Sequence, residues 1–144
     1  MKKVKTVIIG MGRMGKTRYE AMKRHGGYDV VGICDANTKN LAGYLEPIFT
    51  DWKECIEKCD IDAVIVCTYN IVIPDIVCYA IKKGYAVFSE KPPGRNLSDT
   101  LRMKKAYLNS PNKILKFGFN HRYHNSVIEA KALLDSKILG DIVC

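Results

Sequence analysis

Three glycines near the start of the chain have the spacing of a turn that can hold phosphate groups. They belong to a run of six residues directly after an apolar stretch: Gly10, Met11, Gly12, Arg13, Met14 and Gly15. The first glycine permits a tight turn, the second lets the backbone approach a pyrophosphate, and the third lets the next helix pack closely. The N-terminus of that helix would offer free N–H groups and the positive end of its dipole. We therefore expect these six residues to contact a dinucleotide.

An acidic residue, Asp35, closes the next apolar run about twenty residues after the last of these glycines. A carboxylate in this place can accept hydrogen bonds from both ribose hydroxyls and repels a 2′-phosphate. The charge favours NAD as the cofactor, while the nearby Lys39 leaves NADP open. A glycine-rich turn without a ligand is the alternative, but strand, turn, helix and acid follow one another in the order that binding requires.

A lysine follows another apolar run, in the stretch AVFSEKPPGR at 86–95. The two prolines cannot donate to a sheet, so the strand ends before them and leaves Glu90 and Lys91 at its carboxyl edge. The proline pair, with a cis bond as one option, would fix the backbone behind the lysine. A lysine in a desolvated site can take the proton of an alcohol during hydride transfer. The alternative is an exposed lysine in a salt bridge with Glu90.

The elements that must position these residues alternate along the whole chain. Strands are predicted at 5–10, 29–35, 48–50, 62–68, 85–90 and 113–120, and helices at 13–25, 37–45, 51–58, 74–84, 97–110 and 126–137. Helices between strands imply parallel crossovers, so we predict an α/β fold: a doubly wound, mostly parallel Rossmann sheet with helices on both faces. Ligands in such folds lie beyond the carboxyl ends of the strands. The last residues, 138–144, have the pattern of a further strand.

The composition argues against several other classes of protein. A chain of 144 residues, 47% hydrophobic and 26% charged, is typical of a globular domain. The net charge of +8 raises nucleic-acid binding as a third hypothesis, but the basic residues are scattered, so we predict no nucleic-acid partner. No apolar run reaches the ~18–20 residues that span a membrane. The six cysteines lack metal-site spacing, so we predict reduced thiols, no metal, no membrane and a cytoplasmic location.

These features together resemble the glucose–fructose oxidoreductase/inositol dehydrogenase (Gfo/Idh/MocA-like) family. The resemblance rests on the glycine turn, Asp35, the Thr-x-Asn turn at 68–70, Glu-Lys-Pro at 90–92, and the stretch from 118 to 142. It implies a pyridine-nucleotide-dependent oxidoreductase acting on sugars, nucleotide-sugars or polyols. It also implies a dinucleotide-binding domain at 1–120 and a connecting segment at 121–144 that leads to a C-terminal substrate domain absent from this chain.

The resemblance further implies roles for residues around the strand ends. Lys91 would assist proton transfer between nicotinamide and substrate, and Glu90 would position the cofactor and the lysine. The other residues expected to contact the cofactor are Cys67, Thr68, Asn70 and Arg122. Ile73 stands where many members of the family have histidine. Trp52, Tyr69 and Tyr123 are interpreted as packing residues.

The glycine turn specifies binding and not chemistry, so a non-catalytic NAD-sensing or scaffold module stays open as an alternative. Under the leading hypothesis, this chain binds the cofactor but does not turn over a substrate by itself, because one wall of the crevice is missing. We expect the full-length protein to form a homo-oligomer.

Overall fold

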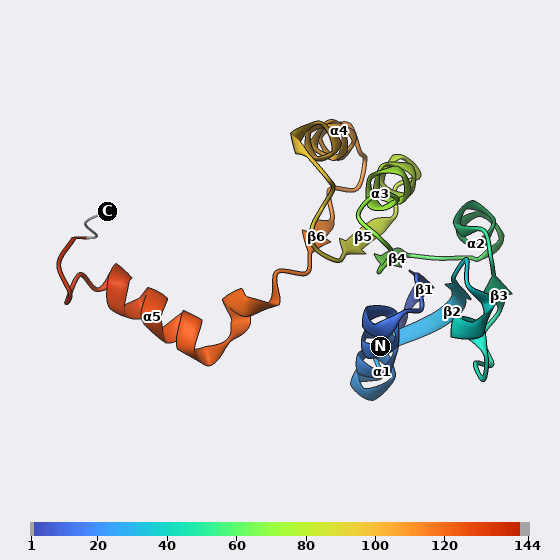
Figure 1. The fold of residues 1–144 in the computed structure, drawn as a ribbon, viewed down its shortest axis with the longest axis horizontal. Helices are drawn as coiled ribbons and strands as arrows, with labels where there is room; N and C mark the ends of the chain where they lie inside the picture. Colours follow the sequence, from blue (N-terminus) through green and yellow to red (C-terminus); the bar gives the residue numbers. More distant parts are fainter. Residues whose placement is uncertain (1, 142–144) are drawn as a thin grey trace.

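The computed structural model describes residues 2–141 and contains a six-stranded parallel sheet (Figure 1). The strands are β1 (Val4–Ile9), β2 (Tyr28–Cys34), β3 (Ile48–Phe49), β4 (Ala63–Val66), β5 (Ala86–Ser89) and β6 (Leu115–Phe117). Their order across the sheet is β3-β2-β1-β4-β5-β6, and every pair is parallel. This is the strand order of a Rossmann fold, in which the order of the strands reverses between β1 and β4.

Helices cover both faces of the sheet. They are α1 (Arg13–His25), α2 (Trp52–Lys58), α3 (Ile73–Lys82), α4 (Leu97–Leu108) and α5 (Asn125–Asp135). Helix α1 lies on one face, and α2, α3 and α4 lie on the other (Figure 1). The predicted doubly wound α/β fold is confirmed, and residues 2–141 contain no second domain.

Two apolar cores form because neighbouring strand residues point to opposite faces. In β1, Val7 and Ile9 join the core beneath α2, α3 and α4, whereas Ile8 joins the core beneath α1. The first core also takes buried side chains from α3 and α4, and the second takes Met22 from α1. The sheet is thereby fixed from both sides, which holds its carboxyl edge in place.

The helix predicted at 37–45 is wrong in type and length. The structure has a 3₁₀ helix at Thr38–Leu41, capped by the Asn37 side chain, which accepts a hydrogen bond from the Lys39 N–H at 3.2 Å. Ala42 is extended, and Gly43 has φ of 86°, in the left-handed region. These two residues end the turn, so the chain runs on as a loop to β3.

The predicted strand at 138–144 does not form in the part that the structure describes. Residues 138–141 follow α5 as a turn, and 142–144 lie outside the described residues. The preceding strand, predicted at 113–120, is confined to Leu115–Phe117. No helix within residues 2–141 has the length and apolar character needed to cross a membrane.

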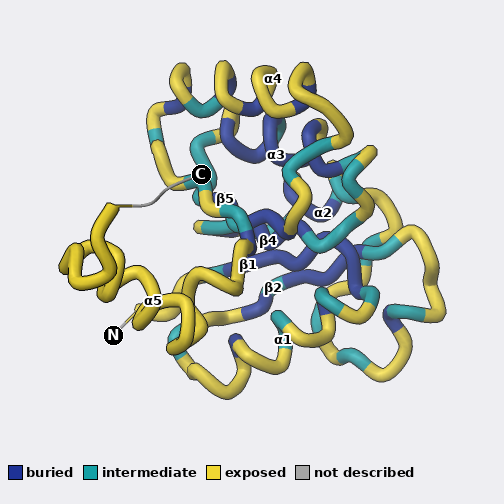
Figure 2. Tube along the Cα trace, turned by 60° about the vertical axis from the view of Figure 1, so that its left-hand side comes forward, coloured by how far each residue is buried: buried dark blue, intermediate teal, exposed yellow. Residues whose placement is uncertain are grey.

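The segment after β6 is an arm that leaves the body of the domain (Figures 1 and 2). A second 3₁₀ helix, η2 (Asn120–Tyr123), leads into α5, and every residue from 119 to 141 is exposed. Large apolar side chains are among them: Phe119, Tyr123, Val127, Ile128, Leu133, Leu134, Ile138 and Leu139. The arm therefore presents a surface that the rest of the described chain does not cover.

Candidate functional site

The turn between β1 and α1 is shaped by the absence of side chains. Gly10 has φ of 94°, and a Cβ on it would lie 2.7 Å from the carbonyl carbon and oxygen of Cys67. A Cβ on Gly15 would lie 1.9 Å from the Gly10 carbonyl oxygen. The turn is thus pressed against the end of β4, and α1 starts directly on top of it. Neither position has room for any other residue type.

The second glycine of the turn has open space around it. A Cβ on Gly12 would meet no atom within 4 Å. Gly12 also precedes α1, whose N-terminus has no side-chain cap and no acidic residue in its first turn. Its first N–H groups consequently point outward without an acceptor from the helix itself. Open space in front of an uncapped helix N-terminus fits a phosphate group.

Asp35 stands at the end of β2 and is held by the surrounding backbone. Its carboxylate accepts hydrogen bonds from the Met11 N–H at 2.7 Å, the Asn37 N–H at 2.8 Å and the Asn40 side-chain amide at 3.1 Å. A carboxylate has about four acceptor positions, so it keeps capacity for a ribose hydroxyl. The Met11 side chain is fully buried beneath α1, so only its backbone faces this loop.

The residues after β4 border the same turn. Burial, with a smaller contribution from Glu90, raises the pKa of the Cys67 thiol to about 12. The Thr68 hydroxyl oxygen is buried and has no hydrogen-bond partner among the described residues. A buried polar atom without a partner is uncommon, and a bound polar ligand is one way to satisfy it. Thr68 therefore fits a cofactor contact, while Asn70 lies half-buried two residues further along the chain.

Two of the three predicted packing residues are wrong. Tyr69 is 84% exposed in the loop after β4, and Tyr123 is 66% exposed in η2 of the arm. Trp52 does pack, with its ring edge-on to Tyr79 at 5.4 Å between centroids.

The end of β5 contains a buried ion pair. Glu90 is 5% exposed, and its Oε1 accepts hydrogen bonds from Nε of Arg18 at 2.7 Å and from Nη2 of the same residue. The next residue, Lys91, is exposed, and no hydrogen bond or ion pair joins its side chain to the described chain. A salt bridge between Glu90 and Lys91, the alternative considered from sequence, does not form. The Lys91–Pro92 peptide bond is cis.

Arg18 is the functional-site residue that the sequence reasoning missed. It lies in α1, one turn after the glycine motif, and is 72 residues from Glu90 along the chain. Its guanidinium also donates to the Asn120 side-chain oxygen at 3.2 Å and lies 4.7 Å from the centre of the Phe88 ring. No local signal marks this pairing; only the predicted sheet order, with α1 beside the strand ends, could have suggested it.

The predicted cofactor residues do not all meet at one point. The glycine turn, Asp35 and Thr68 gather around the ends of β1, β2 and β4, and Glu90 lies at the end of the adjacent β5. Arg13 is exposed at the start of α1. Arg122 lies in η2, at the base of the arm, where its side chain is exposed and makes no hydrogen bond or ion pair with residues 2–141.

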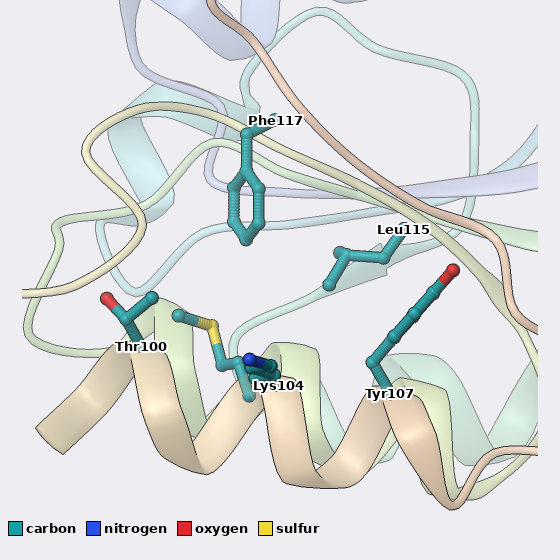
Figure 3. A pocket seen from close by; sticks show the side chains of 6 residues that line it. Thr100, Lys104, Tyr107, Leu115 and Phe117 are labelled. Atoms are coloured by element: carbon teal, nitrogen blue, oxygen red, sulfur yellow. The ribbon is translucent and has the colours of Figure 1, made fainter. Parts of the chain in front are cut away.

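A hollow of about 210 Å³ lies between α4 and β6 (Figure 3). Its lining is mostly apolar and consists of Thr100, Met103, Lys104, Tyr107, Leu115 and Phe117. It exists because β6 is the outer strand of the sheet, so the side chains facing α4 have no further strand beside them. Since the glycine turn follows the central strand β1, this hollow is separate from the site described above.

The strand order, the glycine turn and the acid at the end of β2 define a dinucleotide-binding Rossmann domain. The chain belongs to the Gfo/Idh/MocA oxidoreductase family with an NAD-binding Rossmann fold, whose family model matches residues 4–119. The family predicted from the Glu-Lys-Pro motif is thereby confirmed, and so is NAD as the cofactor of the domain.

Inositol dehydrogenases are among the proteins similar to this chain. It is 29% identical over 143 residues to inositol 2-dehydrogenase of Gluconacetobacter diazotrophicus, covering 94% of this chain and 42% of that protein. Its structure resembles myo-inositol 2-dehydrogenase of Lactobacillus plantarum, with a TM-score of 0.91, 28% identity, and coverage of 99% and 44%. It also resembles scyllo-inositol dehydrogenase of Lactobacillus casei with bound NAD(H) and scyllo-inositol, with a TM-score of 0.91, 26% identity, and coverage of 98% and 43%. The chain spans less than half the length of these proteins.

Proposed function

We propose that this chain is the cofactor-binding part of an NAD-dependent dehydrogenase that oxidises a hydroxyl group of a polyol, sugar or nucleotide-sugar. The observation that carries the proposal is Lys91, an exposed amine that makes no hydrogen bond or ion pair within residues 2–141. It lies at the end of β5, at the same carboxyl edge of the sheet as the turn that fits a dinucleotide. The inositol dehydrogenases among its relatives support the substrate class. NADP is the alternative cofactor, which Asp35 disfavours by its charge.

The protein groups divide the work between binding and proton transfer. NAD, when bound here, would supply the hydride acceptor for the alcohol carbon. The N-terminus of α1 holds the pyrophosphate, and Asp35 holds the adenosine ribose. Thr68, Cys67 and Asn70 line the path between the two halves of the dinucleotide. The Lys91 amine takes the hydroxyl proton, and Arg122 stands at the edge of the crevice as a further cation.

We also propose that residues 1–120 form the dinucleotide-binding domain and that 121–144 lead into a substrate domain. The exposed arm supports this, because its apolar side chains have no cover within residues 2–141. The length of the relatives supports it as well. A substrate domain would complete the crevice and desolvate Lys91, so the chain by itself should bind NAD without turnover.

Two measurements on the same preparation test this function. Calorimetric titration with NAD should give binding in the micromolar range or tighter, and the absence of binding would reject the proposal. The saturated chain is then mixed with polyols, sugars and nucleotide-sugars while NADH absorbance is followed. Steady NADH production that Lys91→Met abolishes would reject the cofactor-only role but keep the dehydrogenase.

An experiment on this chain joined to its substrate domain distinguishes a dehydrogenase from a non-catalytic NAD-sensing module. There, Lys91→Met should lower turnover by ~10²–10⁴-fold while NAD affinity changes little, because a general base acts in the transition state. A fully active Lys91→Met variant would remove the lysine from the mechanism. A joined protein that binds NAD but oxidises none of the panel would favour the non-catalytic module.

A further inference from the structure

We propose that Arg18 is a positioning residue that keeps Lys91 unpaired by holding the neighbouring Glu90 carboxylate. Lys91 follows directly after this acid in the sequence. The inference rests on the proposed function in one respect: a free Lys91 amine matters because it handles the substrate proton. The structural claim itself concerns three side chains of this chain.

The geometry around Glu90 commits its carboxylate to Arg18. Glu90 Oε1 accepts both from Nε, at 2.7 Å, and from Nη2 of the guanidinium. The side chains are 24% exposed for Arg18 and 6% for Glu90, so water screens this pair weakly. A guanidinium donates through a planar fork, which fixes direction as well as charge. Glu90 is therefore held in one place.

Neighbouring structure fixes Arg18 itself. The guanidinium lies 4.7 Å from the Phe88 ring centre, so Phe88 and the Glu90 carboxylate both face Arg18. Its Nη2 also donates to Asn120 at 3.2 Å. A Cβ on Gly118 would lie 2.9 Å from Glu90 Oε2, so glycine there makes room for the carboxylate. The pair is thus enclosed by β5, the end of β6 and η2.

Two consequences follow from this arrangement. Removing only the Arg18 charge would leave a buried carboxylate without compensation, which is strongly unfavourable. We expect the Glu90 carboxylate to lower this cost by turning toward Lys91, the cation next to it in the sequence. The second cation nearby is Lys116, which pairs with Phe88 in the sheet register and can compete.

The rate at which the Lys91 amine reacts measures whether it is paired. Purified chain is treated with a limiting amount of an acetylating reagent at fixed pH, and acetylation of each lysine is followed by peptide mass spectrometry. Lys105, exposed on α4, serves as the internal reference. The proteins compared are the parent, Arg18→Met, Arg18→Lys, Glu90→Gln and Arg18→Met/Glu90→Gln.

We expect Arg18→Met to slow Lys91 acetylation by about threefold or more, as a new ion pair would. Arg18→Lys keeps the charge and should stay near the parent rate. The double variant should also return to the parent rate, because it removes the carboxylate together with its counter-ion. A merely structural role would not give this rescue.

Several outcomes would overturn the proposal. One is an unchanged rate of Lys91 acetylation in a folded Arg18→Met, and another is slower acetylation of Lys116 in place of Lys91. If Arg18→Met does not fold, Glu90→Gln decides: Lys91 must keep the parent rate, and faster acetylation would mean that Glu90 already restrains it. None of these rates depends on NAD, so the titration described above fails or succeeds independently.

Discussion

The turn after β1 and the turn after β5 meet the same edge of the sheet, yet they are built in different ways. The first is made of backbone: Gly10 and Gly15 lie against neighbouring main chain, and the groups offered to a ligand are N–H donors. The second is made of side chains: Glu90 is fixed by an arginine from α1. A turn built from backbone is determined by consecutive residues, and it can therefore be predicted from a short motif. A turn built from side chains depends on a partner that is distant in the sequence.

The largest effect should come from adding one methyl group to the backbone-built turn. Gly15→Ala places a Cβ 1.9 Å from the Gly10 carbonyl oxygen, and main chain cannot move away as a side-chain tip can. We expect a loss of at least about 3 kcal/mol in the free energy of unfolding. Urea denaturation followed by circular dichroism measures it.

The matched control changes the glycine three positions earlier. Gly12 has no neighbour within 4 Å of the added Cβ, so Gly12→Val should cost about 1 kcal/mol or less in stability. It should still weaken NAD binding by at least about tenfold, because the side chain fills the phosphate space. Equal stability losses in the two variants would show that the close approach at Gly15 does not matter.

A smaller effect is expected at Asp35, the residue after β2 whose carboxylate accepts a hydrogen bond from the Met11 N–H of the first turn. Asp35→Arg should weaken NAD binding by about tenfold and shift preference toward NADP, since it replaces a ribose acceptor with a phosphate partner. Titration of both dinucleotides gives the ratio. Asp35→Asn is the control that keeps an acceptor for the Met11 N–H without the charge. An unchanged NAD/NADP ratio in Asp35→Arg would place the ribose elsewhere.

Gly118 tests the side-chain-built turn in the same manner. Gly118→Ala puts a Cβ 2.9 Å from Glu90 Oε2, but here the contact is a carboxylate that can shift slightly. We expect a stability loss of about 1–2 kcal/mol, less than for Gly15→Ala. In a Glu90→Ser background the extra cost should vanish. A cost that persists without the carboxylate would contradict the contact as its cause.

The smallest effect should come from a side-chain cluster away from both turns. Glu46 is mostly buried, which favours its neutral form, but hydrogen bonds from Lys23 and Tyr19 outweigh burial and lower the Glu46 pKa. A lowered pKa in the folded state stabilises the fold above the unfolded pKa, and this contribution disappears as pH falls through the folded value.

Glu46→Gln should therefore cost about 1 kcal/mol at pH 7 and progressively less below about pH 4. Unfolding midpoints of the two proteins across pH 3–7 test this. A difference that stays constant over the range would mean that the carboxylate charge contributes nothing.

The sequence by itself determined the strand–helix alternation, the glycine turn and the family. Those features are local: Gly10, Gly12 and Gly15 act through their own backbone, and Asp35 through its place at a strand end. It also placed Glu90 and Lys91 correctly at the carboxyl edge of β5, because proline cannot continue a strand. It went wrong at 37–45, where the helical pattern of side chains was overridden by an extended Ala42 and a left-handed Gly43.

Only the tertiary structure decided which charges pair. Local reasoning offered the adjacent lysine as an alternative partner for Glu90, but the parallel crossover brings Arg18 of α1 over Phe88 and onto the carboxylate. Tyr69 and Tyr123 were likewise assigned to packing, although nothing in the described chain covers them. Pairing and burial depend on which elements the fold sets side by side, and that is fixed by the sheet order as a whole and not by neighbouring residues.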